Sequence, residues 1–307
     1  CDRALMSPEP TSDATPAAYR PATGRRHEIW HAVFRKQITV VAAALIAFYA
    51  LVAFLGPILL PLDPFGTNLR ALAASPSWDH LLGTDLSGRD NLSRIVYGMR
   101  TSLTVGVAAV VIYIAIGTVI GTLAGFHRGL FDTIASRFID ALLSIPLLLL
   151  VTVFVAVLEP GVLTVILVIG LLGWPQTARL TRAQTLSMRE SDFVMAARVT
   201  GLSPARILYA HVLPNLAAPL IVVASLGIGT AILLEAALGF LGLGVRPPTP
   251  SLGVMITEAK DPITLRTEPW IWVPPAVALA SLVMAVNLLG DALRDALDPG
   301  SSSQAAK

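Results

Sequence analysis

The residues with the most informative chemistry lie in a short stretch, residues 191–215. Ser191 and Asp192 are residue types that cap the N-terminus of a helix, so a first short helix is expected to follow them. Gly201 can adopt the positive φ with which many helices end. The pattern indicates a short helix with a defined stop, and its side chains offer recognition of a partner surface and not bond-breaking chemistry.

A second helix is expected directly after this stop. Ser203 followed by Pro204 is the typical pattern of an N-cap with proline at the first helical position. The sequence therefore predicts a second helix over residues 204–210, with Pro214 marking the entry into the next apolar segment.

The paired helices would present a compact apolar face rimmed by arginines, with little core of their own. Such a face usually docks into a partner. An amphipathic element lying on lipid headgroups is the alternative interpretation. The apolar residues concerned are Ala196, Ala197, Ala205, Ile207 and Leu208.

One carboxylate, Glu235, lies near the end of an apolar segment. A carboxylate that faces lipid costs about 2.5–3.5 kcal/mol, so Glu235 is expected to face a cavity, a partner subunit or an arginine. Two interpretations follow: a residue of the transport path or its outer gate, or a structural hydrogen-bond or ion-pair position at the outer rim, with Arg89 or Arg94 as candidate partners.

Asp85, Arg89 and Asp90 form a second charged group. They suit a charge network that holds an outer loop against a partner, or a self-contained turn in which the two aspartates cap backbone amides. Arg137 and Asp140 are one helical turn apart and are expected to pair with each other or with a neighbouring loop.

Nothing in the sequence indicates catalysis or metal binding. His27 and His31 lie four residues apart in the polar tail, His80, His127 and His211 lie in separate segments, and no Gly-x-Ser-x-Gly pattern is present. Neither Lys36 nor Lys260 follows the glycine spacing of a phosphate-binding loop. No catalytic residue, metal site or bound cofactor is predicted.

The elements that position these residues are membrane spans. Of 307 residues, 54% are hydrophobic and 14% are charged, with a mean hydropathy of +0.71. Six runs approach the roughly 20 residues of a spanning helix, and each is expected to be helical because lipid cannot satisfy an open backbone. Trp174 and Pro175 interrupt the fourth. The predicted spans are residues 38–60, 103–125, 138–158, 162–180, 216–238 and 273–289.

The distribution of Arg and Lys predicts cytoplasmic N- and C-termini. The net charge of +2, without a basic stripe, speaks against nucleic acid. The predicted order is a polar tail (1–37), the first span (38–60), an outer loop (61–102), a five-helix core (103–290) containing a cytoplasmic loop (181–215), and a cytoplasmic end (291–307).

At residues 195–214 the chain resembles the permease family of ABC importers. Ala196-Ala197, Gly201 and Leu213-Pro214 stand at the family spacing, whereas Met195 stands where glutamate is usual and His211 stands at an apolar position. Further blocks are similar to the C-type subunit of dipeptide and oligopeptide permeases. These blocks are residues 82–90, 129–132, 144–146, 239–244 and 287–299.

The resemblance implies an all-α membrane protein of six spans with the type I ABC importer permease fold, in the cytoplasmic (inner) membrane. It implies that residues 181–215 couple the permease to an ATPase. The expected coupling residues are Met195, Ala196, Ala197, Gly201, Ser203, Pro204, Ala205, Arg206, Leu208, Leu213 and Pro214.

The resemblance also implies the partners. They are a homologous second permease, two ATPase subunits or one fused ATPase that binds ATP and Mg²⁺, and an extracytoplasmic peptide-binding protein. The peptide substrate and membrane lipid complete the set. Nickel, glutathione or oligosaccharide cargo remains open, because importers of these solutes share much of the pattern.

Two other classes remain as alternatives from the residues alone. An ion-coupled secondary transporter would carry ionisable residues at mid-membrane and broken, repeated helices, whereas these spans are nearly free of charge away from their ends. An intramembrane enzyme would need paired catalytic residues within the spans, and the sequence indicates none.

Overall fold

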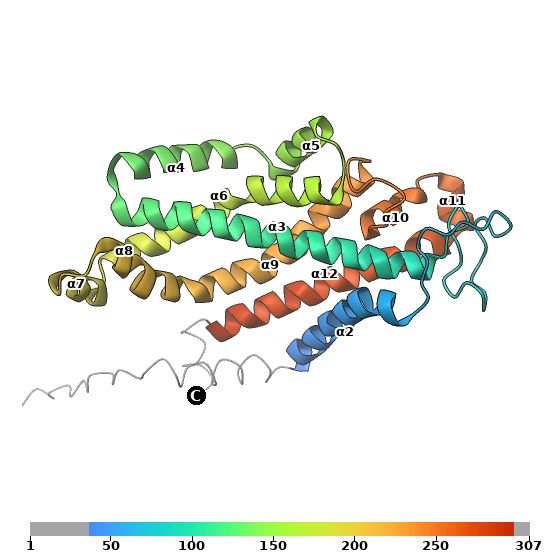
Figure 1. Ribbon diagram of the computed structural model, residues 1–307, viewed down its shortest axis with the longest axis horizontal. Helices are drawn as coiled ribbons and strands as arrows, with labels where there is room; N and C mark the ends of the chain where they lie inside the picture. Colours follow the sequence, from blue (N-terminus) through green and yellow to red (C-terminus); the bar gives the residue numbers. More distant parts are fainter. Residues whose placement is uncertain (1–36, 298–307) are drawn as a thin grey trace, which may run out of the picture.

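The structure, a computed structural model, describes residues 37–297 and shows an elongated helical bundle (Figure 1). No β-strand occurs in this described part; Thr84 and Asp90 form an isolated bridge. Its helices are α2 (Gln37–Leu59), α3 (Asn91–His127), α4 (Gly129–Leu143), α5 (Leu147–Val157), α6 (Val162–Arg189), α7 (Asp192–Val199), α8 (Pro204–Ile207), the π-helical turn η1 (Leu208–Val212), α9 (Leu213–Phe240), α10 (Leu252–Glu258), α11 (Pro262–Thr267) and α12 (Pro269–Leu297).

The bundle has two ends of different character (Figure 1). Helices α7 and α8 lie at one end, called here the hairpin end. The connection from α2 to α3, with α10 and α11, lies at the other, called the loop end. The long helices α3 and α9 run between the two ends, and α12 packs on α9 from the loop end (Figure 1).

Several predictions fall on residues that the structure does not describe. Residues 1–36 of the predicted polar tail and residues 298–307 of the predicted C-terminal end lie outside the described residues. Lys36, one of the two lysines tested for a phosphate-binding loop, lies there as well.

The predicted spans appear as five continuous helices and one broken span. Five helices are long and apolar enough to cross a membrane, and α4 and α5 pass the same test as a pair bent by 84°. The prediction of one straight helix over residues 138–158 is therefore wrong. Pro146 disfavours helical backbone at Ile145 and has no N–H to donate, so α4 ends at Leu143 and a new helix starts at Leu147.

Two other helices extend beyond their apolar runs. α3 begins at Asn91, inside the segment 61–102 that was expected to be loop, and α6 continues through Pro175 to Arg189, inside the expected loop 181–215. A hydropathy pattern detects only the part of a helix that suits lipid. Polar extensions of the same helix are missed for that reason.

The fifth span begins earlier than its apolar run indicates. Helix α8 passes through η1 directly into α9, so residues 204–240 form one long helical element, and Pro214 lies within its course instead of at its start. The N–H of Leu213 donates to the carbonyl of Leu208 in the widened turn. A π turn suits this position because Pro214, which follows it, has no N–H to donate to a helical hydrogen bond, and its ring crowds the carbonyl four residues before it.

Small residues bring α3 and α6 together along their length. Gly117, Gly121 and Gly125, spaced four apart, pack on Thr177, Thr181 and Thr185, which have the same spacing. A Cβ on Gly117 would lie 2.6 Å from Cβ of Thr177, and the Thr181 hydroxyl donates to the carbonyl of Gly117 over 3.1 Å. Close backbone approach of this kind is typical of helix packing in membranes.

Ion pairs tie α4 to the last turns of α6. Asp140 accepts from Nη2 of Arg179 over 2.7 Å, and Arg182 binds Asp132 through two nitrogens, with Nη2 2.9 Å from Oδ2. The expectation that Asp140 pairs with Arg137 or with a loop is therefore wrong. Its partner lies on the neighbouring helix, which the sequence spacing alone does not indicate.

Helix α2 lies at the periphery, against α12 and α3, and leaves most of its surface uncovered (Figure 1). Its outward residues are large and apolar, as expected where lipid or another subunit covers a helix. The most exposed of them are Val41, Phe48, Ile58 and Leu59.

Candidate functional site

The hairpin end is built on backbone geometry that the sequence predicted. Gly201 follows α7 with φ of +76°, its N–H donates to the carbonyl of Arg198, and the N–H of Leu202 donates to the carbonyl of Ala197. These bonds form a Schellman motif, which satisfies the carbonyls at a helix end. Helix α7 therefore ends at a fixed position.

The start of α8 also follows the prediction. The Ser203 hydroxyl accepts from the N–H of Arg206 over 3.4 Å, and Pro204 occupies the first turn. Ser191 stands at the N-cap position of α7, but its hydroxyl donates back to the carbonyl of Met188, so no side-chain cap forms there. The second helix is one α-helical turn followed by η1, not a regular helix over residues 204–210.

The apolar face of the hairpin differs from the prediction. Ala197, Ile207 and Leu208 are buried, whereas Ala196 and Ala205 are exposed. The buried side chains pack against Phe126 of α3 and against residues of η1 and α9. The hairpin thus has a core of its own, shared with the ends of the long helices, and the expected common face is wrong.

A different set of side chains forms the outward surface. We call it the hairpin surface; its members are Phe193, Met195, Ala196, Val199, Ala205 and Tyr209. Val199 is 87% exposed and Met195, at the position of the usual glutamate, is 52% exposed. Pro214 is exposed and Leu213 half-buried at the base. An outward apolar surface on a rigid base is suited to a protein partner.

Arginines surround this surface. The guanidinium of Arg198 lies over the Phe126 ring at 5.4 Å, and Arg128 pairs with Glu190. Arg206 is exposed on α8. Arg198 and Arg206 are thus exposed basic residues on α7 and α8, whereas Arg128 is neutralised by Glu190.

The loop end is held by a cluster of buried charges. Asp85 accepts from Nε of Arg89 over 2.7 Å and from Nη1 of Arg94, while its other oxygen accepts the N–H groups of Ser87 and Arg89. Asp85 thus takes part in an ion-pair network within this chain and also caps its own turn.

Glu258 completes the cluster from α10. Nη2 of Arg94 donates to Oε1 of Glu258 over 2.6 Å, and Nη2 of Arg89 donates to the same oxygen over 3.2 Å. Arg94 and Asp85 are each 1% exposed. Two arginines and two carboxylates leave the cluster neutral, which suits its burial. Glu258 was not among the predicted site residues, because it lies 164 residues from Arg94 in the sequence.

Asp90 is not part of this cluster. Its Oδ2 accepts the N–H and the hydroxyl of Ser93, both over 2.8 Å, and its Oδ1 lies 3.1 Å from Nδ1 of His80. Asp90 therefore caps the N-terminus of α3, as in the turn interpretation.

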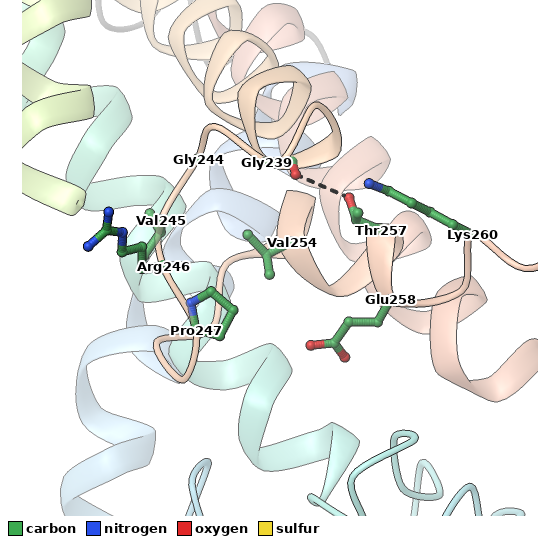
Figure 2. Close-up of a pocket in the computed structure, with 10 residues that line it drawn as sticks. Gly239, Gly244, Val245, Arg246, Pro247, Val254, Thr257, Glu258 and Lys260 are labelled. Atoms are coloured by element: carbon green, nitrogen blue, oxygen red, sulfur yellow. Dashed lines mark hydrogen bonds between the residues drawn. The ribbon is translucent and has the colours of Figure 1, made fainter. Parts of the chain in front are cut away.

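A cavity adjoins the charged cluster (Figure 2). It has a volume of about 370 Å³ and lies between α10 and the segment that follows α9. Glu258 links its wall to the ion pairs, and the hydroxyl of Thr257 donates to the carbonyl of Gly239 over 3.3 Å (Figure 2). Arg246 and Lys260 also line it, so this cavity carries charges of both signs.

Glu235 lies inside the protein and away from the arginines. It is fully buried, and its Oε2 accepts from the Ser102 hydroxyl of α3 over 2.8 Å. Arg89 and Arg94 bind Asp85 and Glu258 instead, so the suggested pairing with Glu235 is wrong. The observed contact fits the structural interpretation of this carboxylate.

The family to which this chain is related is described as the inner membrane component of binding-protein-dependent transport systems, and it matches residues 117–303. The dipeptide transport system permease protein DppC of Haemophilus influenzae is 41% identical over 93% of this chain and 98% of that protein. The di/tripeptide transport system permease protein DppC of Pseudomonas aeruginosa is 43% identical over 83% of this chain and 84% of that protein.

Two further similarities extend the comparison. The glutathione transport system permease protein GsiD of Pectobacterium atrosepticum is 37% identical over 89% of this chain and 90% of that protein. Among solved structures, an inward-facing form of the MetNI methionine ABC transporter has a chain that matches with a TM-score of 0.55 at 20% identity, covering 67% of this chain and 96% of that one. That structural likeness establishes the fold alone.

The family match, the near full-length relatives and the arrangement of spans agree with one another. The chain belongs to the family of inner membrane components of binding-protein-dependent transport systems, and it is a multi-pass protein of the inner membrane.

Proposed function

We propose that this chain is the permease subunit of an ATP-driven importer that moves di- and oligopeptides across the membrane by alternating access. The observation that carries the proposal is the α7–α8 hairpin. It is a rigid element between two spans with an outward apolar surface. A rigid element of this kind can convert a push from a partner into a movement of the spans attached to it.

The partner at the hairpin surface is an ATPase in this proposal. The sequence has no phosphate-binding loop, so ATP and Mg²⁺ belong to that partner, as two subunits or one fused chain. The hairpin end then lies in the cytoplasm, in agreement with the exposed Arg198 and Arg206.

The loop end faces the opposite side, where a peptide-binding protein delivers the substrate. Asp85, Arg89 and Asp90 act there by ordering the loop; the side chains available for contact are exposed neighbours such as Trp78. A homologous second permease completes the transport path. Glu235 serves to fix α3 against α9 near this end.

Peptide cargo is supported by the two relatives named for dipeptides and di/tripeptides, at 41% and 43% identity. The relative named for glutathione, itself a short peptide, is less similar over a comparable length. Glutathione is therefore the second cargo to test.

The coupling role is tested by placing a charge on the hairpin surface. Val199→Asp puts an unpaired carboxylate where the ATPase would bury an apolar side chain, and Ser187→Asp adds the same charge at an exposed site on α6 outside that surface. The assembled importer in proteoliposomes, with its binding protein, is assayed for ATP hydrolysis and dipeptide uptake.

Val199→Asp is expected to remove at least about 90% of uptake and to weaken co-purification of the ATPase, since burying an unpaired charge at an interface costs several kcal/mol. Ser187→Asp should leave dipeptide uptake and co-purification of the ATPase unchanged. Full coupling in the Val199→Asp importer, or full coupling after residues 196–213 are replaced by a Gly/Ser linker, would contradict the proposal.

A further inference from the structure

A second cavity opens on the side of the bundle, between its two ends, where Gln176 and Thr230 are exposed. It has a volume of about 350 Å³ and is bounded by α3, α5, α6 and α9. Its residues on α6 include Gln176, which stands near the middle of Val162–Arg189. Tyr113, the lining residue on α3, stands at the middle of the apolar run 103–125, so the cavity lies within the membrane-crossing part of the bundle.

Tyr113 is held at the edge of this cavity by two glycines. Gly173 of α6 faces the ring, where an added Cβ would lie 3.0 Å from Cδ1, and a Cβ on Gly227 of α9 would collide with the hydroxyl. The ring position therefore depends on the absence of side chains at both sites. Tyr113 is half-buried, and within residues 37–297 its hydroxyl has no hydrogen-bond partner, so the hydroxyl is free to bind a group that enters the cavity.

Gln176 is a second polar side chain of this cavity that has no hydrogen-bond partner among the described residues. It is exposed on α6, and its amide makes no hydrogen bond to the described part of the chain. A primary amide has two donors and an acceptor, and lipid can satisfy none of them. Gln176 is therefore unsuited to a lipid-facing position and suited to a polar solute or a polar neighbour.

The remainder of the lining is neutral. Thr230 donates its hydroxyl to the carbonyl of Leu226 in its own helix, and the other walls are largely aliphatic. No Asp, Glu, Lys, Arg or His lines this cavity. An ion would lack a counter-charge here, whereas the amide N–H and carbonyl of a peptide main chain match a tyrosine hydroxyl and a glutamine amide.

We infer that Tyr113 and Gln176 form a transit site that hydrogen-bonds the main-chain amide of the peptide as it crosses the membrane. This inference rests on the proposed peptide import and names where the solute is held inside this subunit. Two neutral hydrogen bonds give weak binding, and a transport path needs binding that is weak enough to release the solute.

Access to the site is tested by cysteine substitution. Gln176→Cys is introduced with Cys1→Ser, since Cys1 is the single cysteine of the chain. The complete importer in proteoliposomes is treated with the membrane-impermeant reagent sulfonatoethyl methanethiosulfonate, and labelling is read from the mass of this chain. Phe48→Cys, on the exposed face of α2, is the matched control.

The inference predicts that Gln176→Cys is labelled and that millimolar dipeptide with its binding protein slows labelling by at least about twofold, as expected at half occupancy. Phe48→Cys should show no effect of dipeptide. Absence of labelling at Gln176→Cys, or labelling that dipeptide leaves unchanged, would overturn the transit site.

Uptake kinetics supply an independent test. Tyr113→Phe and Gln176→Leu each remove hydrogen-bonding groups at nearly constant volume and should lower the maximal rate of dipeptide uptake about fivefold to tenfold. Gly227→Ala, which displaces the Tyr113 hydroxyl, should act in the same direction. Gln184→Leu, on the same helix but outside the cavity, is the matched control.

The wild-type importer separates the two claims. If it takes up no dipeptide, peptide import itself is wrong. If it takes up dipeptide and the Tyr113 and Gln176 variants match it, the transit site is wrong. Loss of the second permease on purification of Gln176→Leu would also overturn it, because Gln176 would then serve the interface between the two permeases.

Discussion

The two ends of the bundle are ordered by different physical means. At the hairpin end, backbone hydrogen bonds and a small apolar core fix α7 and α8, and the surface that remains is apolar. At the loop end, Asp85, Arg94 and Glu258 join segments that are far apart in the chain through buried ion pairs. The hairpin end can therefore move as one piece with its helices, whereas the loop end depends on a few charged contacts.

This comparison is tested most strongly by removing the central arginine of the loop end. Arg94→Met should destabilise this end by about 3–5 kcal/mol, because Asp85 and Glu258 would remain together with only Arg89 as a cation. Hydrogen exchange of peptides from residues 61–90 and 252–258 should accelerate, while exchange in α7 and α8 should stay unchanged.

Arg100→Met is the control for that change. Arg100 is exposed on the same helix and lies over the Phe54 ring at 5.9 Å, so its loss should cost about 1 kcal/mol or less. Equal effects of the two substitutions would contradict the assignment of a special role to the buried cluster.

The cap of α3 provides a smaller change at the same end. Asp90→Ala removes the acceptor for the N–H and hydroxyl of Ser93 and should cost about 1–2 kcal/mol, measured by thermal unfolding in detergent. Asp79→Ala, an exposed aspartate in the same connection, should change stability by less than about 0.5 kcal/mol. If Asp90→Ala lowered stability as much as Arg94→Met, the loop end would not depend more on its long-range ion pairs than on a local helix cap.

At the hairpin end the expected effects are smaller. Gly201→Ala forces a Cβ into the left-handed region at φ of +76°, where no neighbouring atom lies within 4 Å, so backbone strain of about 1 kcal/mol is the whole cost. Gly161→Ala adds the same methyl group without such a φ and serves as the control. Faster exchange should be confined to residues 192–203; spread to the loop end would show that the two ends are coupled.

The smallest effect is expected for Ser203→Ala. Its bond to the N–H of Arg206 is long, at 3.4 Å, so the loss should be about 0.5–1 kcal/mol. Comparing the stability losses of Ser203→Ala and Asp90→Ala then shows how much a neutral helix cap contributes relative to a charged one at the opposite end of the bundle. A larger effect for Ser203→Ala would reverse that ranking.

Local signals in the sequence predicted much of the fold. The apolar runs located the membrane-crossing helices, and the cap residues Gly201 and Ser203 correctly located the hairpin, since each acts on backbone groups within a few residues. The same local reasoning missed the break at Pro146. Hydropathy also predicted α3 and α6 to be shorter than they are, because it detects the residues that suit lipid and misses the polar ends of a helix.

The candidate site was predictable in position but not in orientation. The resemblance placed the hairpin correctly in the chain, yet whether Ala197 and Leu208 face inward depends on Phe126 of α3 and Leu216 of α9, which come from other elements. Glu258, Tyr113 and Gln176 were not singled out. For the latter two, a polar residue within an apolar run was the available signal.

The sequence by itself determined that this chain spans a bilayer, which segments of it cross, and which turns bound the hairpin helices. Hydropathy and capping decide these features because they act over a few residues. Only the tertiary structure decided which charges neutralise one another and which polar groups are left without a partner. Those outcomes depend on distances between residues on different elements, 39 positions apart for Asp140 and Arg179 and 164 for Arg94 and Glu258, and such distances are fixed only when the helices pack.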